Sequence, residues 1–460
     1  MPSSKPSSAA HGFAYSPDQF RQLVADALAE AKRLGASDAG AEASEGCGLS
    51  VSVRKGELEN VELNRDKSLG ISVYLGQRRG NASTSDFSPQ ALKDTVRAAY
   101  DIARFTAEDP VAGLPDVEDL SLDSASRPEL DLFHPWDLSA EKAAELALRC
   151  EAAAFATDSR VTNSEGAAVS AQQSHFITGN TRGFSGGYAS SRHSISVAPI
   201  AGRGAGMQRD SWYSSMRAAG DLAKPEAVGR YAAERALSRL KARKVKTAEV
   251  PVLFESTVAA GLLGALVQAT SGGALYRKAS FLLDSLGTPV MASHIDISED
   301  PHVQRGKGSS PFDDEGVLTR ARSVVEAGVL QGYFLSTYSA RKLGMRTTGH
   351  AGGSHNLVMS SRLTAPGDDL KTMLRRLGTG LFVTELMGQG VNYVTGDYSR
   401  GASGYWVENG EIAYPVHEVT IAGNLREMFQ QIVGIGTDRY TLGTKTIGSV
   451  LLARMKLAGS

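Results

Sequence analysis

Cysteine is scarce in this sequence. Only Cys47 and Cys150 occur among 460 residues, both in apolar or small-residue surroundings. They exclude a disulfide framework and are typical of buried free thiols in a reducing compartment. The opening segment, MPSSKPSSAAHG, has no apolar core for export. We therefore expect a cytoplasmic protein in which residues 1–14 form a disordered tail.

An excess of charge and a long apolar run are also missing. Lys plus Arg number 49 and Asp plus Glu number 50, a net charge of −1. Direct nucleic-acid binding needs a basic surface, so we expect no such partner. The uncharged run at 256–267, STVAAGLLGALV, is well short of the roughly 20 apolar residues that span a membrane. It predicts a buried helix and no membrane partner.

The composition is that of an ordinary globular protein, with 42% hydrophobic and 22% charged residues. Helical periodicity alternates in the first half with strand-like patterns, and the second half is mostly strand. We predict an α+β fold: an N-terminal domain of helices on a mixed or antiparallel sheet (15–245), and a C-terminal, mostly antiparallel β domain with short helices (246–460). The predicted helices cover 17–34, 89–105, 141–156, 225–243, 256–269, 335–343, 368–377 and 424–433.

One turn pattern, Val-x-x-Gly-x-Leu/Ile, recurs at 53–58, 325–330 and 407–412. Each copy predicts a hairpin in which glycine adopts a positive φ. The last copy ends the stretch from Thr384 to Gly410, which is rich in glycine and β-formers. We predict two strands there, including Tyr393–Thr395, joined by an irregular loop at 396–401.

Several fragments resemble catalytic motifs but lack the required context. The G-x-S-x-G match at 183–187 is followed by a strand pattern rather than a helix, so a plain turn is favoured. His417-Glu418 begins like a zinc motif, but Ile421 stands where the second histidine belongs. His350 and His355 flank Gly352-Gly353 and favour a structured turn over a metal site. The carboxylates at 313–315 are typical either of a solvated turn or of a hard-cation site.

Longer runs carry a resemblance to a known family. They are TELMGQGVN (384–392), TGDYSRGA (395–402), GYWVENGEI (404–412), TGHAGG (348–353), DDEGV (313–317) and IAGNL (421–425). On these residues the chain resembles the TldD/TldE (PmbA) peptidases over nearly its whole length, most closely the TldE/PmbA branch. The resemblance implies a cytoplasmic, two-subunit metallopeptidase that cuts unfolded or leader peptides, in peptide maturation and antitoxin turnover.

The sequence departs from the metal-binding branch of that family. The TldD-type subunit carries His-Glu-x-x-x-His and a C-terminal cysteine that hold the metal. Here the histidine positions are Phe254 and Ala259, only Glu255 remains, and no cysteine follows Cys150. A glutamate acts as a general base only on a polarised water. We therefore expect no catalytic residue, metal or cofactor in this chain, zinc in the partner subunit, and Glu255 as a relic or a helix-end cap.

Two functional hypotheses follow. The chain is either the non-metal subunit that completes a groove around a TldD-type partner's site, or a non-catalytic homodimer that binds peptides or partners. Some members of this branch are described as modulators of DNA gyrase, an effect that would run through protein turnover. Extended peptide can add to a sheet edge through main-chain bonds. The residues proposed to line the groove or interface are Gly388, Gln389, Gly390, Asn392, Asp397, Tyr398 and Arg400.

Overall fold

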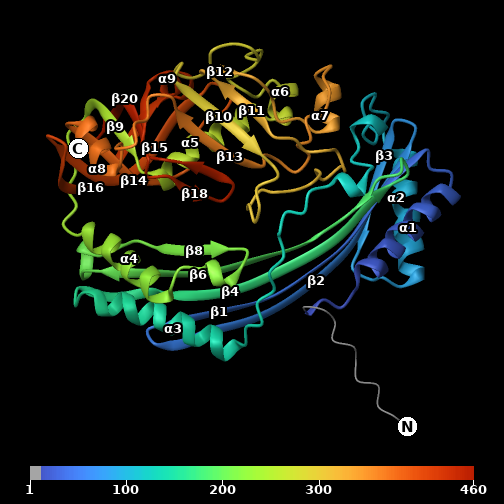
Figure 1. Ribbon diagram of the computed structural model, residues 1–460, viewed down its shortest axis with the longest axis horizontal. Helices are drawn as coiled ribbons and strands as arrows, with labels where there is room; N and C mark the ends of the chain where they lie inside the picture. The colour runs from blue at the N-terminus through green and yellow to red at the C-terminus, as the bar shows by residue number, and fades with distance from the viewer. Residues whose placement is uncertain (1–11, 460) are drawn as a thin grey trace, which may run out of the picture. The chain divides into compact units, whose positions relative to one another are not determined.

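The computed structural model describes residues 12–459 (Figure 1). The chain forms two compact units. Unit 1 comprises the residues up to Leu237 together with Asp314–Leu318, and unit 2 comprises Ser238–Asp313 and Thr319–Ser460. Within the described range, no helix is both long and apolar enough to cross a membrane.

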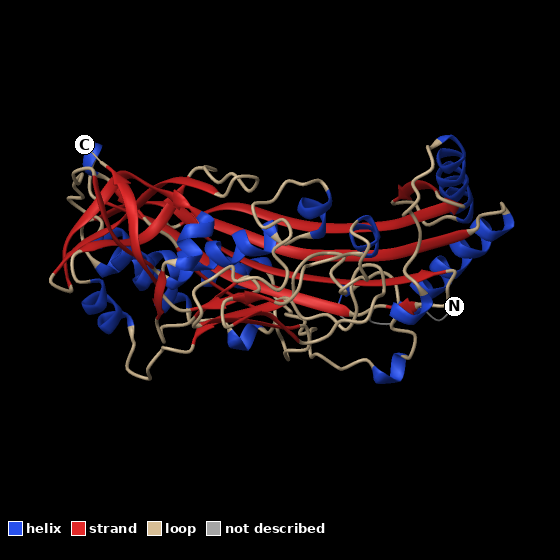
Figure 2. Ribbon diagram, turned by 90° about the horizontal axis from the view of Figure 1, so that it is seen from above, coloured by secondary structure: helices blue, strands red, loops and turns tan. Residues whose placement is uncertain are grey.

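Unit 1 is built on one antiparallel sheet of eight strands. Its order is β3-β2-β1-β4-β6-β7, with β5 paired to β4 and β8 paired to β6. The strands are β1 Asp38–Arg54, β2 Glu57–Leu75, β3 Arg78–Thr84, β4 Val161–Asn180, β5 Ser185–Gly186, β6 Ala189–Ala201, β7 Gln208–Arg209 and β8 Trp212–Met216. Figure 2 shows the long strands side by side in one layer.

Helices cover one face of this sheet. They are α1 Pro17–Arg33, α2 Pro89–Phe105, α3 Ala140–Thr157 and α4 Pro225–Ser238. Burial alternates residue by residue along β1, as expected when only one face of a sheet meets apolar helices. The core has two parts, one beneath α1 and α2 and the other beneath α3 and α4. Ser16 begins α1 with a capping box completed by Gln19.

Unit 2 contains two six-stranded sheets, ordered β12-β11-β10-β13-β19-β18 and β16-β15-β14-β9-β20-β17. The second sheet also pairs β16 with β20, which closes five of its strands into a ring. The strands are β9 Ala248–Phe254, β10 Ile295–Asp300, β11 Arg322–Glu326, β12 Val329–Leu330, β13 Asn356–Ser361, β14 Gly380–Met387, β15 Asp397–Glu408, β16 Glu411–Asn424, β17 Ile432–Ile435, β18 Tyr440–Leu442, β19 Lys445–Ile447 and β20 Val450–Ala458.

Five helices accompany these sheets: α5 Ser256–Ala269, α6 Gly272–Tyr276, α7 Thr337–Lys342, α8 Leu370–Leu377 and α9 Leu425–Gln430. The uncharged α5 is the predicted buried helix. Its leucines, among them Leu263 and Leu266, are fully buried in the largest apolar cluster of the unit.

The α+β prediction is confirmed, and so are the three hairpins. The turn residues Lys55-Gly56, Ala327-Gly328 and Asn409-Gly410 all have positive φ, from 47° to 82°. Each pair joins two adjacent antiparallel strands. The repeated pattern is therefore a turn signal, since both central residues need the left-handed conformation.

Four local predictions were wrong. The helix predicted at 424–433 ends at Gln430, and Ile432 begins β17. Tyr393–Thr395 is a turn rather than a strand, because the chain folds back between Asn392 and β15. The fourth helix ends at Ser238 instead of Arg243, and Lys241 has a φ of 64° that no α-helix accommodates. The predicted tail lies outside the described residues as far as residue 11. Beyond it, Phe13 is buried against the His175 ring instead of being disordered.

Candidate functional site

The junction between β9 and α5 holds Phe254, Glu255 and Ala259, the positions where the resemblance places a metal motif. β9 lies between β14, to which it runs parallel, and β20. It ends at Phe254, and the Glu255 amide donates to the carbonyl of Val383 at 2.9 Å. The Glu255 carbonyl then accepts from the amides of Val258 and Ala259 and so starts the helix.

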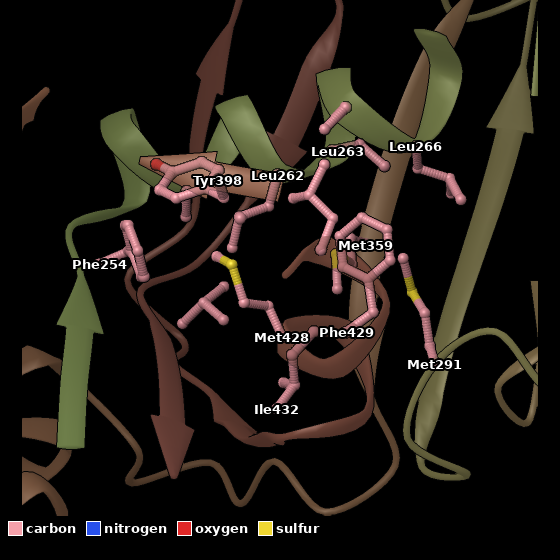
Figure 3. Close-up of a cluster of buried hydrophobic side chains, with 14 of the residues drawn as sticks. Phe254, Leu262, Leu263, Leu266, Met291, Met359, Tyr398, Met428, Phe429 and Ile432 are labelled. Carbon is pink, nitrogen blue, oxygen red and sulfur yellow. The ribbon is translucent and has the colours of Figure 1, made fainter. Parts of the chain in front are cut away.

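Phe254 and Ala259 are both part of the apolar core. The side chains of Phe254 and Ala259 have no solvent exposure. Figure 3 shows Phe254 pointing toward Met428 and Tyr398 in a cluster of buried hydrophobic side chains. Among residues 12–459, no group of three or more His, Cys, Asp or Glu side chains could hold a metal ion. The residues at this junction therefore do not fit a catalytic zinc ion, which needs three protein ligands.

Glu255 occupies the N-cap position of α5. Its carboxylate accepts from the Thr257 hydroxyl at 2.6 Å, but it makes no side-chain bond to the helix backbone. A carboxylate is favoured at this position by the helix dipole even without such a bond. The geometry is compatible with the predicted helix-end role.

A β-bulge in β14 lies next to this junction. The register between β14 and β15 shifts at Val383/Glu385, so that Thr384 is the extra residue. The Thr384 hydroxyl is buried and has no hydrogen-bond partner within the described part of the chain. Its neighbour Glu385 pairs with Arg239. Bulges of this kind are frequent beside functional sites because they redirect side chains.

The glycine-rich loop at 388–396 continues from β14 and folds back onto the start of β15. The Ser399 amide donates to Gly390 at 2.6 Å, and the Asn392 amide donates to Asp397 at 2.8 Å. A Cβ atom on Gly390 would overlap the carbonyl oxygen of Ser399, so only glycine permits this approach. The loop exposes Gly388, Gln389, Gly390 and Asn392 to solvent.

The other predicted groove residues separate into different environments. Asp397 is exposed and accepts from Thr395 and Asn424, hydrogen bonds that lower the pKa of its carboxyl. Tyr398 is 5% exposed and lies in the core, where burial raises its pKa to about 12. Arg400 is half-buried, and its Nε has no partner within residues 12–459. The loop and Asp397 are exposed and can contact a partner, whereas the buried Tyr398 packs in the core.

His350 and His355 belong to a buried ionic network. The Nε2 of His350 donates to Glu299 at 2.9 Å, and the amide of His355 donates to the other carboxylate oxygen at 2.7 Å. Arg322 pairs with the same carboxylate at 2.7 Å and lies over the Phe334 ring. The network joins the turn at 349–355 to β10 and β11.

The pKa values in this network follow from burial and pairing. Burial alone would raise the pKa of Glu299, but the His350 hydrogen bond and the charges of His350 and Arg322 outweigh it and lower the pKa to about 2. Burial lowers the pKa of His350, and the bond to Glu299 offsets part of that shift. Glu299 and Arg322 were missed by the sequence reasoning, because no local pattern links them to the two histidines.

The remaining motif fragments take structural positions. Residues 183–187 form the turn between β4 and β5 and the short strand β5 itself, with no helix after them. His417 and Glu418 lie on β16. Asp313 is buried and accepts from the amide of Ala351 at 2.9 Å. Asp314 lies near Glu42, whose pKa is raised by burial and by that neighbouring charge.

Comparisons with known proteins match this chain along most of its length. Family models match as PmbA/TldA metallopeptidase domain 1 (41–103), central domain (133–240) and C-terminal domain (247–459). Metalloprotease PmbA of Escherichia coli O157:H7 is 50% identical over 443 residues, covering 95% of this chain and 97% of the relative. The Haemophilus influenzae PmbA homolog is 47% identical over 442 residues, covering 96% of both chains.

Solved structures and relatives named TldD homologs are also similar to this chain. A Bacteroides thetaiotaomicron protein described as a candidate modulator of DNA gyrase superposes with a TM-score of 0.90 at 26% identity, covering 97% of this chain and all of that one. TldE from Thermococcus kodakarensis shares the fold, with a TM-score of 0.82 at 19% identity over 95% of this chain and all of its own. A Haemophilus influenzae TldD homolog is 26% identical over 213 residues, 44% of this chain and 43% of the relative. This chain belongs to the PmbA/TldD family of metallopeptidases.

Proposed function

We propose that this chain is the non-metal subunit of a two-subunit zinc peptidase, in which a TldD-type subunit supplies the ion. The observation that carries the proposal is the replacement of both motif histidines by core residues, Phe254 and Ala259, with no exposure to solvent. A lone Glu255 cannot activate water without an ion to polarise it. Relatives named TldD homologs supply a candidate partner branch.

The loop at 388–396 is the surface proposed to meet the partner or its peptide substrate. Its exposed glycines leave the backbone accessible, and backbone bonds recognise extended peptides of many sequences. Two exposed apolar side chains belong to this surface: Met387 directly before the loop is 42% exposed, and Val394 within it is 54% exposed. Protein interfaces typically have an apolar core surrounded by a polar rim, and exposed apolar side chains beside polar main-chain groups fit that composition. Unfolded or leader peptides are the proposed substrates, in peptide maturation and antitoxin turnover.

If the zinc ion is held only by the TldD-type subunit, peptidase activity should require both subunits. The chain alone should not cleave an unfolded polypeptide such as denatured casein, whereas a mixture with a TldD-type subunit should. Glu255→Ala should leave the activity of the mixture unchanged, since this carboxylate takes no part in the reaction. Metal-dependent cleavage by the pure chain, lost in Glu255→Ala, would refute the proposal.

The proposed interface has its own test. Met387→Asp should weaken assembly with the TldD-type subunit, measured by size-exclusion chromatography with light scattering. Leu363→Asp is the matched control, because Leu363 is a 60% exposed apolar residue elsewhere in unit 2. Equal effects of the two variants on assembly would show that the loop is not part of the interface. A homodimer that forms no complex with the TldD-type subunit would favour the alternative, a non-catalytic homodimer that binds peptides or partners.

A further inference from the structure

A second candidate binding surface lies in unit 1, along the outer edge of β2. The strand runs from Glu57 to Leu75 and pairs with β1 along almost its whole length. On the other side, β3 pairs only with residues 69–75. Figure 1 shows β3 at one end of the long strands. We call residues 57–68 the free edge of β2, since no described strand pairs with them on this side.

Long unpaired edges are hazardous because their N–H and C=O groups template further strands. Proteins usually protect such edges with proline or lysine, with bulges, or with a covering element. The free edge of β2 contains no proline, and its bulge lies near one end, opposite Ser52/Val53. Residues 60–68 remain a regular ladder. The two basic residues of the free edge already have partners: Arg65 donates to Glu45, and Lys67 donates to the Tyr15 hydroxyl.

The face shared with the helices is apolar at Val61 and Leu63, and Arg65 and Lys67 follow on the same face. Leu63 is 80% exposed and Val61 is 41% exposed. Their cross-strand neighbours in β1, Leu49 and Val51, are buried beneath α3. The apolar layer therefore continues from the core to the free edge, where nothing among residues 12–459 covers Leu63. A cavity of about 390 Å³ beside Leu63 offers room for a further side chain.

The other face of the free edge is acidic. Glu62 and Asp66 alternate with the apolar positions, and Glu57 and Glu59 precede them. All four carboxylates are exposed, and no described residue forms an ion pair with any of them. A strand that pairs here is favoured if it presents apolar side chains on one face and lysine or arginine on the other. A second copy of the chain would bring equally acidic residues, and like charges across a strand pair are destabilising.

We propose that the free edge of β2 binds an extended basic polypeptide by strand addition. Main-chain bonds to residues 60–68 hold it, apolar side chains cover Val61 and Leu63, and basic side chains face Glu62 and Asp66. The site is independent of the partner surface around residues 388–396 and needs no metal. It would let the chain hold unfolded, basic segments.

Fluorescence anisotropy with the full chain tests this proposal. The probe is a labelled ten-residue peptide of alternating valine and lysine, which should bind. Glu62→Lys should weaken binding about tenfold, because an attractive cross-strand charge pair becomes repulsive. Glu118→Lys, at an exposed acid in a short helical turn of the same unit, should not.

Alternate N-methylation of the peptide separates strand addition from simple charge attraction. N-methylation removes amide donors on one edge of the peptide while keeping its charge and apolar side chains. One of the two alternating N-methylated sets should abolish binding, and the other should retain it. Equal binding of both sets, or no binding of the unmodified peptide, would overturn the proposal. A dimer of the chain that Glu62→Lys converts to monomer would overturn it as well.

Discussion

Placing a histidine at position 259 should destabilise the protein rather than create a zinc site. Ala259 is fully buried on α5 and belongs to the main apolar cluster of unit 2. An imidazole there must displace packed neighbours, which costs about 1–3 kcal/mol. It must also bury ring nitrogens without a partner, at about 1–3 kcal/mol more. The two terms together predict a loss of roughly 2–6 kcal/mol of unfolding free energy for Ala259→His.

Urea unfolding followed by circular dichroism measures this loss, with and without zinc. Gln268→His is the matched control, since Gln268 lies on the same helix and is exposed. We expect a change within about 0.5 kcal/mol for the control, as for most surface substitutions. Zinc should not recover the stability of Ala259→His. A variant as stable as the control, or one that zinc stabilises at stoichiometric amounts, would show that the junction is still a preformed metal site.

Three further predictions concern other parts of unit 2. Glu299→Gln should cost about 3–5 kcal/mol in urea unfolding, because it leaves the half-buried Arg322 guanidinium without its countercharge. The folded-state pKa of Glu299 is lowered to about 2, so its stabilisation is present above the unfolded-state pKa of about 4.3 and is lost as pH falls toward 2. The stability of Glu299→Gln should therefore depend less on pH across that range. Gly390→Ala should increase proteolysis of its loop, because the added Cβ overlaps the Ser399 carbonyl, whereas Gly367→Ala, which meets no atom within 4 Å, should not. Tyr398→Phe should leave the phenolate absorbance unchanged up to about pH 11, since burial raises the pKa of Tyr398 to about 12; a lost transition near pH 10 would contradict its burial.

The sequence predicts those parts of the fold that depend on local chemistry. The helix at Pro17–Arg33 follows from its serine cap and apolar period, and the Asn409-Gly410 turn follows from its need for positive φ. The failures occur where distant contacts decide. Tyr393–Thr395 has strand propensity, yet the Tyr393 carbonyl accepts from Phe281 and the segment turns. Propensity is a weak guide at such positions.

The sequence predicts only some features of the candidate site, because the others depend on contacts between residues that are distant in sequence. The absence of histidine at positions 254 and 259, where the resemblance places metal ligands, can be read from the sequence alone. The grouping of Asp397, Tyr398 and Arg400 was proposed from their adjacency in sequence. On β15, Tyr398 and Arg400 are two residues apart and share one face, whereas Asp397 points to the other face, so the three were not expected to have one environment. Glu299 could not be predicted, because it lies 51 residues before His350 and meets it only in the folded chain.

Metal analysis of the purified protein tests the central claim most directly. Zinc per chain is measured by inductively coupled plasma mass spectrometry, first on this chain alone and then on its one-to-one complex with a TldD-type subunit. The account predicts far less than one zinc per chain for the isolated protein and one zinc per complex. One tightly bound zinc per isolated chain would contradict it.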